Sequence, residues 1–159
     1  MITLQIAEDL RRAIDEAVPS LQALSDSDAS RERQPGKWSP KQVIGHLIDS
    51  ASDNHQRFVR AQFSDDRQCA GYQQDEWVAV QRYADADWRL LIALWREFNL
   101  HLARVIELTD ASVAQKQRRR HNLDEVGFKS IRPDDPVTLA WFMADYVDHL
   151  RHHLKQIFS

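Results

Sequence analysis

Two histidines four residues apart, His149 and His153, lie near the end of the chain on the apolar stripe of a predicted helix. At this spacing their imidazole rings project from adjacent turns of one helical face. Two such rings can bind one metal ion, as the two histidines of an HExxH helix do. The alternative is a hydrogen-bonded core histidine beside a solvated neighbour. A third histidine from another helix would favour the metal site.

His46 is that third candidate, and it lies in a helix predicted over residues 39–63. Ser39 has the chemistry of an N-cap, Pro40 suits the first helical position, and Gln42 completes a capping box. His46 then lies about 9 Å from the start of its helix. The helix that carries His149 is predicted over 135–158, with Asp-Pro at its start, so the histidine pair lies about 20–26 Å from that start.

Further amphipathic stripes predict helices over residues 3–24 and 85–108, and only four glycines and few β-branched runs favour an all-α fold. The connections 64–84 and 109–134 are long for a compact bundle. The three histidines meet only if the second and fourth helices are antiparallel. The second and third helices are then parallel, which requires a long connection at 64–84. The sequence therefore predicts a four-helix bundle of up-down-down-up order.

Composition excludes several classes of protein. With 159 residues and 43% hydrophobic content, the chain is predicted to form a single domain, 1–159. A net charge of −3 argues against nucleic-acid and anionic-lipid partners. No apolar run is long enough to span a membrane or to serve as a secretory signal, and the lone Cys69 suits a reducing compartment. We therefore expect a cytoplasmic protein.

Three acids are candidates for orienting the imidazole rings or for acid–base catalysis. Asp49 and Asp53 follow His46 on nearly the same helical face, and Asp145 precedes His149 by one turn. Each could equally be an ordinary surface carboxylate.

Three aromatic residues, Tyr72, Trp77 and Trp141, are candidates for the wall of a substrate pocket, with a plain core role as the alternative. Of the other histidines, His55 is expected to face solvent. His101 is expected to be packed or hydrogen-bonded.

The chain resembles the DinB-like four-helix bundle superfamily over nearly its whole length. Three motifs carry the resemblance: Lys37–Ser50 with its Ser-Pro and His46, Tyr72 with Asp-Glu-Trp77, and His149-x-x-His-His153. The resemblance implies a divalent metal held by one histidine on the second helix and two on the fourth. Carried over, these ligands are His46, His149 and His153, whereas His152 points aside.

The resemblance also implies a range of activities: thiol S-transferases that use bacillithiol or mycothiol, glutathione-dependent isomerases, and members with no assigned reaction. Among these we expect thiol S-transferase chemistry on a small electrophile. A metal-dependent hydrolase, a non-catalytic metal-binding protein and a metal-free interaction module are the alternatives. Imidazole ligands favour zinc or nickel, with iron or manganese as further options. We also expect a low-molecular-weight thiol as co-substrate and a homodimer.

Overall fold

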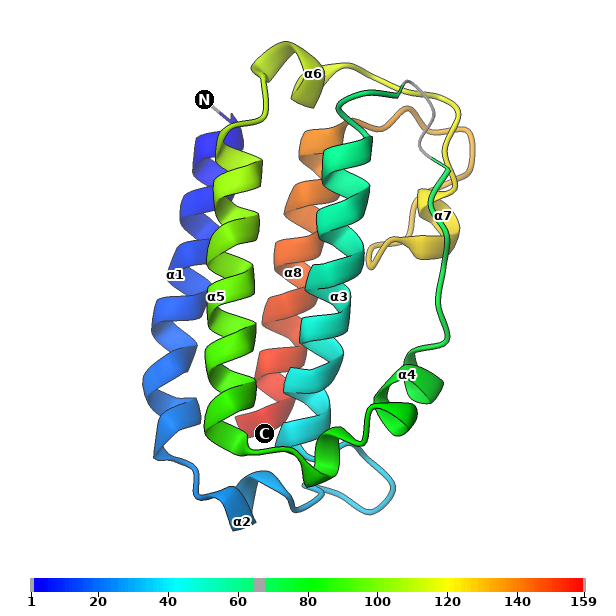
Figure 1. Ribbon diagram of the computed structural model, residues 1–159. Helices are drawn as coiled ribbons and strands as arrows, with labels where there is room; N and C mark the ends of the chain where they lie inside the picture. Colours follow the sequence, from blue (N-terminus) through cyan, green and yellow to red (C-terminus); the bar gives the residue numbers. More distant parts are fainter. Residues whose placement is uncertain (1, 65–67, 159) are drawn as a thin grey trace.

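The computed structural model describes residues 2–64 and 68–158, and four long helices dominate it (Figure 1). They are α1 (Ile2–Ala23), α3 (Pro40–Arg60), α5 (Trp88–Glu107) and α8 (Leu139–Phe158). The predicted all-α four-helix bundle is confirmed. None of the described helices has the length and apolar character needed to cross a membrane.

The directions of the helices bring distant parts of the chain together. In Figure 1, α1 and α8 run downward, whereas α3 and α5 both run upward. Because α3 and α5 are parallel, the chain between them has to return along the length of the bundle. That connection contains α4 (Gln74–Val80) and the 3₁₀ helix η1 (Tyr83–Asp85). The connection from α5 to α8 contains α6 (Ala111–Gln115) and α7 (Leu123–Val126).

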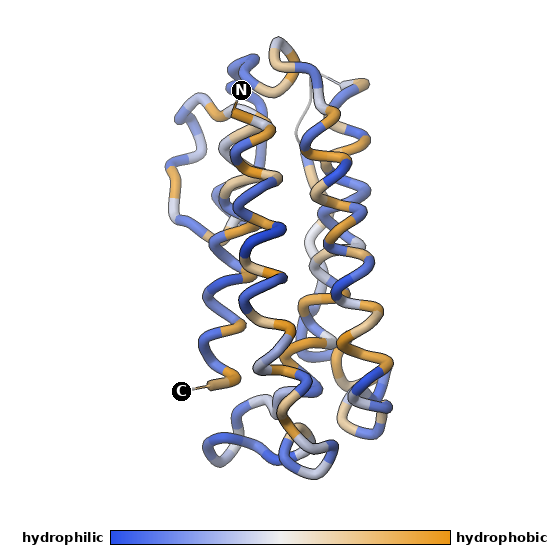
Figure 2. The backbone as a smooth tube through the Cα atoms, turned by 90° about the vertical axis from the view of Figure 1, so that its left-hand side faces the viewer, coloured by the Kyte–Doolittle hydropathy of each residue, from blue (hydrophilic) through white to orange (hydrophobic). Residues whose placement is uncertain are grey.

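The apolar stripes of the four helices form one core. Both α1 and α3 pack against α5 and α8. Figure 2 shows hydrophobic and hydrophilic residues alternating along the long helices, as expected for amphipathic helices around a shared interior. Fully buried members of this core include Leu10, Ile14, Leu47, Leu102 and Leu150.

The start of α3 agrees with the sequence. The Ser39 hydroxyl accepts a hydrogen bond from the Gln42 backbone N–H at 3.4 Å, and the Gln42 side chain accepts one from the Ser39 N–H at 2.9 Å. This capping box fixes the first turn of α3, one turn before the helix reaches His46.

The helices predicted to start at residues 85 and 135 begin later in the structure. Asp87 rather than Asp85 caps α5, accepting from the Leu90 N–H at 2.8 Å. The fourth helix begins at Leu139 rather than at the Asp135-Pro136 pair. Val137 is held extended in a bridge with Arg118, so the helix starts after it, and the Thr138 hydroxyl accepts from the Trp141 N–H at 3.0 Å.

The helix α1 agrees with the predicted range 3–24: it continues past the exposed Pro19 to Ala23, with Leu21 buried in its last turn. The polar, turn-rich composition of segment 25–36 favours a linker, but the segment contains the short helix α2 (Asp26–Ala29), which Ser25 caps.

Candidate metal centre

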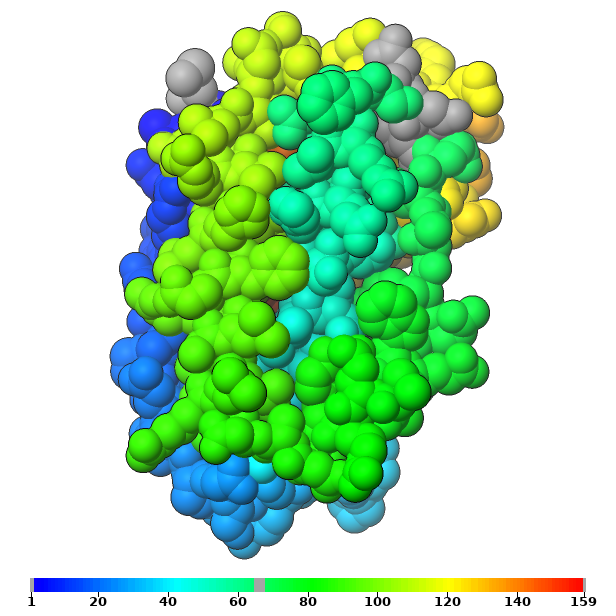
Figure 3. All heavy atoms as spheres, in the orientation of Figure 1, coloured from blue at the N-terminus to red at the C-terminus, as the bar shows by residue number. Residues whose placement is uncertain are grey.

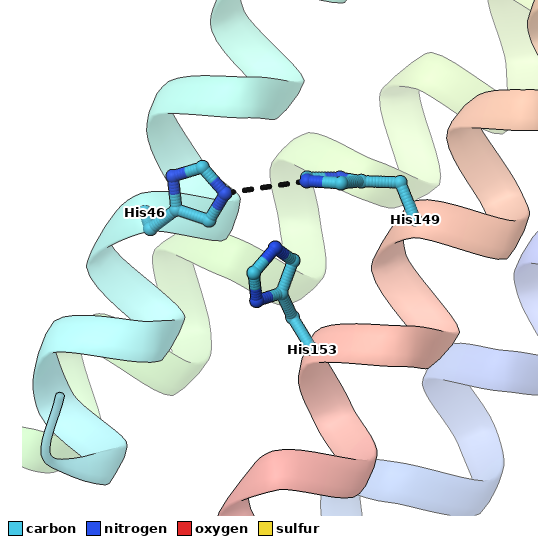
Figure 4. Close-up of side chains that lie close together, drawn as sticks. All are labelled: His46, His149 and His153. Atoms are coloured by element: carbon cyan, nitrogen blue, oxygen red, sulfur yellow. Dashed lines mark hydrogen bonds between the residues drawn. The ribbon is translucent and has the colours of Figure 1, made fainter. Parts of the chain in front are cut away.

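Three histidines meet between α3 and α8 (Figure 4). His46 projects from α3 toward His149 and His153, which project from successive turns of α8. One ring nitrogen of each histidine lies within 4.8 Å of the others, and the Nε2 atoms of His46 and His149 are 3.3 Å apart. The structure thus brings together the three residues that the sequence proposed as ligands.

This geometry fits a divalent ion. Two nitrogens bound at about 2.0–2.1 Å to a tetrahedral zinc lie roughly 3.3–3.4 Å from each other. That separation matches the distance between the Nε2 atoms of His46 and His149. His46 and His149 are 103 residues apart in the sequence, so the packing of α3 against α8 is what brings their rings together.

Burial keeps the imidazoles in the form that binds metal. Desolvation, with a smaller contribution from His153, lowers the pKa of His46 to about 3. Desolvation also lowers the pKa of His149 and of His153 below the ordinary value. At neutral pH all three rings are therefore uncharged, and a neutral ring nitrogen can donate its lone pair to a cation.

Neighbouring side chains select the ring nitrogen that faces the centre. His153 Nδ1 lies 2.9 Å from Gln156 Oε1, which only accepts, so Nδ1 carries the proton and Nε2 is free to bind. His149 Nδ1 lies 3.5 Å from the Ser50 hydroxyl. His46 Nδ1 is buried without a hydrogen-bond partner, and the Trp38 ring packs against this imidazole at a centroid distance of 5.0 Å.

Replacing Gln156 with leucine is expected to weaken zinc binding by about tenfold, since loss of an outer hydrogen bond to a ligand typically costs 10–100-fold. The side chain is exposed, so the fold should tolerate the change. Chelator competition on the purified variant measures the affinity. Lys155→Leu, one residue earlier and also exposed, is the control. Equal affinity in both variants would remove Gln156 from the site.

A cavity of about 320 Å³ opens beside the histidines. His149 and His153 form part of its wall, which also contains residues of α3, of the segment 71–74 and of the segment 125–128. The remaining lining residues are Ser50, Asn54, Arg57, Gly71, Tyr72, Gln74, Glu125, Val126, Gly127, Phe128, Phe142, Asp145 and Tyr146. The cavity is therefore large enough for a small molecule in contact with His149 and His153.

The carboxylate of Asp145 lies on the cavity wall but is bonded to the backbone. It accepts hydrogen bonds from the N–H groups of Phe128 at 2.7 Å and Lys129 at 2.8 Å. The structure gives it the role of holding this loop, in place of the predicted contact with His149. The Phe128 ring, positioned by that loop, packs against His149 at 5.6 Å between centroids.

The other two acids also bind groups other than the imidazoles. Asp49 accepts from the Tyr83 hydroxyl at 2.7 Å and from the Gln81 amide at 2.8 Å. Asp53 pairs with Arg57 at 2.7 Å. Asp49 thereby joins α3 to the segment 70–83, which covers part of the first half of α3 in Figure 3. Neither Asp49 nor Asp53 is among the residues that line the cavity.

The three predicted pocket aromatics occupy different positions. Tyr72 lines the cavity. Trp77 packs against Tyr72 at 4.9 Å between centroids, with the rings tilted by 52°, and is 41% exposed, so it supports the wall from outside. Trp141 is half-buried in the first turn of α8, away from the lining, whereas its neighbour Phe142 is part of it.

The remaining histidines of α3, α5 and α8 lie apart from this centre. His152 is exposed and lies 3.1 Å from the Gln156 amide, consistent with its predicted orientation away from the site. His55 is half-buried against the exposed His101, with their rings 5.1 Å apart. The contact differs from the prediction that His55 faces solvent. His101, predicted to be packed or hydrogen-bonded, is exposed but has its ring against His55.

Sequence reasoning missed several lining residues. Ser50, Asn54 and Arg57 follow His46 at intervals of four, eight and eleven residues, so helical periodicity alone could have identified them. Glu125 and Phe128 come from the connection 109–134, whose path no periodic pattern predicts.

Comparisons with known proteins agree with this description. A sequence model described as "DinB superfamily" matches residues 9–157. The Bacillus subtilis protein called "Putative metal-dependent hydrolase YfiT" is 24% identical over 155 residues, which cover 97% of this chain and 79% of the relative. A solved structure of YfiT, described as "a probable metal-dependent hydrolase with an unusual four-helix bundle topology", superposes with a TM-score of 0.74 at 20% identity. That match covers 98% of this chain and 82% of the YfiT chain.

Proposed function

The chain belongs to the DinB superfamily, and on that premise we propose that it is a metal-dependent enzyme that transfers a low-molecular-weight thiol to a small electrophile. The observation that carries the proposal is the convergence of three neutral imidazoles beside a cavity of about 320 Å³. Three histidine ligands leave coordination positions open, which is typical of a catalytic rather than a structural metal site.

His46, His149 and His153 would hold the ion, with zinc or nickel favoured and iron or manganese as alternatives. A bound divalent ion would lower the pKa of a thiol or water that coordinates it. Neighbouring side chains would hold the imidazole rings in place. Gln156 orients His153, Ser50 orients His149, and Phe128 covers one side of His149. Tyr72 and Phe142 place the electrophile within the same cavity.

The cavity offers one free carboxylate as a base for hydrolysis, whereas thiol transfer requires none. Hydrolysis at a metal centre generally uses a nearby carboxylate as general base. Two acids line this cavity: both oxygens of Asp145 already accept backbone hydrogen bonds, and Glu125 is exposed to solvent. A thiol would need no such base, because coordination to an ion would lower its pKa far enough for the proton to pass to solvent.

Metal-dependent hydrolysis is the second candidate, since the names of YfiT and of its structure describe that activity. In that case Glu125 is the cavity acid whose side chain is accessible for proton transfer.

Zinc- or nickel-loaded protein is expected to consume a chlorinated aromatic or an epoxide when supplied with bacillithiol, mycothiol, glutathione or coenzyme A. The conjugate is measured by mass spectrometry. Conjugation should disappear in His149→Ala and persist in His152→Ala. Full metal occupancy with release of a hydrolysed product and no conjugate would favour the second candidate. Occupancy with neither product would contradict both.

A further inference from the structure

Three hydroxyl groups belong to residues that line the cavity, and two of them already have partners. The Tyr146 hydroxyl donates a hydrogen bond to Asn99 Oδ1 at 2.5 Å. The Ser50 hydroxyl lies 3.5 Å from His149 Nδ1. The third hydroxyl, that of Tyr72, has no hydrogen-bond partner among the described residues. It is therefore the cavity hydroxyl that is left free to bind a ligand.

The Tyr72 hydroxyl is accessible as well as unpaired. The side chain is half-buried, and its oxygen is not one of the unpaired polar atoms that are closed off from solvent in the described part of the chain. Burial, and to a smaller extent the nearby Tyr72, raises the pKa of Tyr146, which is 2% exposed and belongs to the same cavity wall. Tyr72 thus extends toward the cavity, while Trp77 packs against its ring.

The surroundings of Tyr72 keep this hydroxyl protonated. Burial raises its pKa, and the charges of Asp49 and Asp53 raise the pKa further, against an opposite contribution from Arg57. At neutral pH the group is therefore an O–H donor. A donor held in such a cavity stabilises an oxygen atom on which negative charge develops during a reaction.

A proton donor in the cavity distinguishes between classes of electrophile. A chloride ion leaves carbon without taking up a proton, whereas an epoxide oxygen becomes an alkoxide unless a proton reaches it. A positioned acid therefore accelerates the opening of an epoxide much more than the displacement of chloride.

We propose that the substrate is an epoxide and that Tyr72 is the general acid that protonates its oxygen, an inference that rests on the proposed thiol transfer. The thiolate sulfur forms a bond to one epoxide carbon, the C–O bond of that carbon breaks, and its electron pair stays on oxygen. The Tyr72 O–H gives its proton to this oxygen. The product is a β-hydroxy thioether, and water returns a proton to the tyrosinate.

The first test compares two substrates that differ in their leaving group, styrene oxide and benzyl chloride, with the same thiol. In Tyr72→Phe, the ratio of kcat/KM for styrene oxide to kcat/KM for benzyl chloride should fall by about a hundredfold, the lower end of what a general acid contributes. Tyr83→Phe is the matched control, since its hydroxyl is already bonded to Asp49, and it should keep the parent ratio. An unchanged ratio in Tyr72→Phe would overturn the proposal.

The second test measures binding and does not depend on turnover. The chain has three tyrosines, so protein labelled with 3-fluorotyrosine should give three ¹⁹F signals, and the signal lost in Tyr72→Phe belongs to Tyr72. Without thiol or added metal, styrene oxide should shift that signal more than ethylbenzene, which has the same ring and no acceptor oxygen. Equal shifts with both compounds, or no shift with either, would contradict the donor role.

The two tests separate this proposal from the proposed function. A Tyr72 signal that responds selectively to styrene oxide, in a protein that forms no conjugate, would keep Tyr72 as the donor to an epoxide oxygen and reject the thiol as nucleophile. Conjugation of both substrates, with the same ratio in Tyr72→Phe as in the parent protein, would keep thiol transfer and reject Tyr72 as the acid.

Discussion

Replacing His149 with alanine is expected to lower zinc affinity by more than about a hundredfold, beyond the 10–100-fold range typical of losing an outer partner. The reason is geometric: His149 faces His46 at 3.3 Å and shares a helical face with His153, so its loss leaves two neutral ligands for a divalent ion. His46→Ala and His153→Ala should behave alike. Elemental analysis and chelator competition measure the loss.

His152→Ala and His55→Ala are the matched controls for this series. His152 is an immediate neighbour of His153 but is exposed, and His55 belongs to α3 as His46 does, yet its ring packs against His101. Both variants should retain one ion per chain. Equal losses across all five variants would show that the three-histidine assignment is wrong.

Gly45→Ala is expected to destabilise the protein by about 2 kcal/mol, although alanine gains about 1 kcal/mol of helix propensity. A Cβ at this position would lie 2.2 Å from two ring carbons of Tyr83. The buried ring would have to move, and its hydroxyl would lose the 2.7 Å hydrogen bond to Asp49. The free energy of unfolding in urea measures the effect.

Gly71→Ala provides the comparison for this prediction. Its added Cβ would meet only Val126 at 3.9 Å, an ordinary contact. Its stability should stay within about 0.5 kcal/mol of the parent protein. If Gly45→Ala were as stable as Gly71→Ala, the close approach of Tyr83 to α3 would not constrain the helix.

The clustering of the three histidines could be predicted because it depends on regular features. Histidines four apart share a helical face in any α-helix, and the long connection at 64–84 constrains the direction of the helix that brings His46 to them. The cap of α3 could also be predicted, because a serine and a glutamine three residues apart form the two reciprocal hydrogen bonds of a capping box.

Other features depend on irregular backbone, whose path cannot be predicted from the periodic spacing of apolar residues. Asp85 and Asp135 have the same capping chemistry as Asp87 and Thr138, and only the path of the preceding turn decides which residue caps the helix. Asp145 has the right spacing to reach His149. The loop at Phe128, whose course the sequence does not indicate, takes both of its oxygens instead.

The position of the ligands in the chain has a consequence for assembly. His46 and His149 are separated by 103 residues, so the centre cannot form until the last helix has been synthesised and has docked against α3. An ion bound there acts as a cross-link between early and late segments, adding about 2.7 kcal/mol to native stability at a free concentration 100 times its Kd. An ion at this site would therefore bind only after α8 has docked against α3, and its occupancy would report on the folding of the bundle.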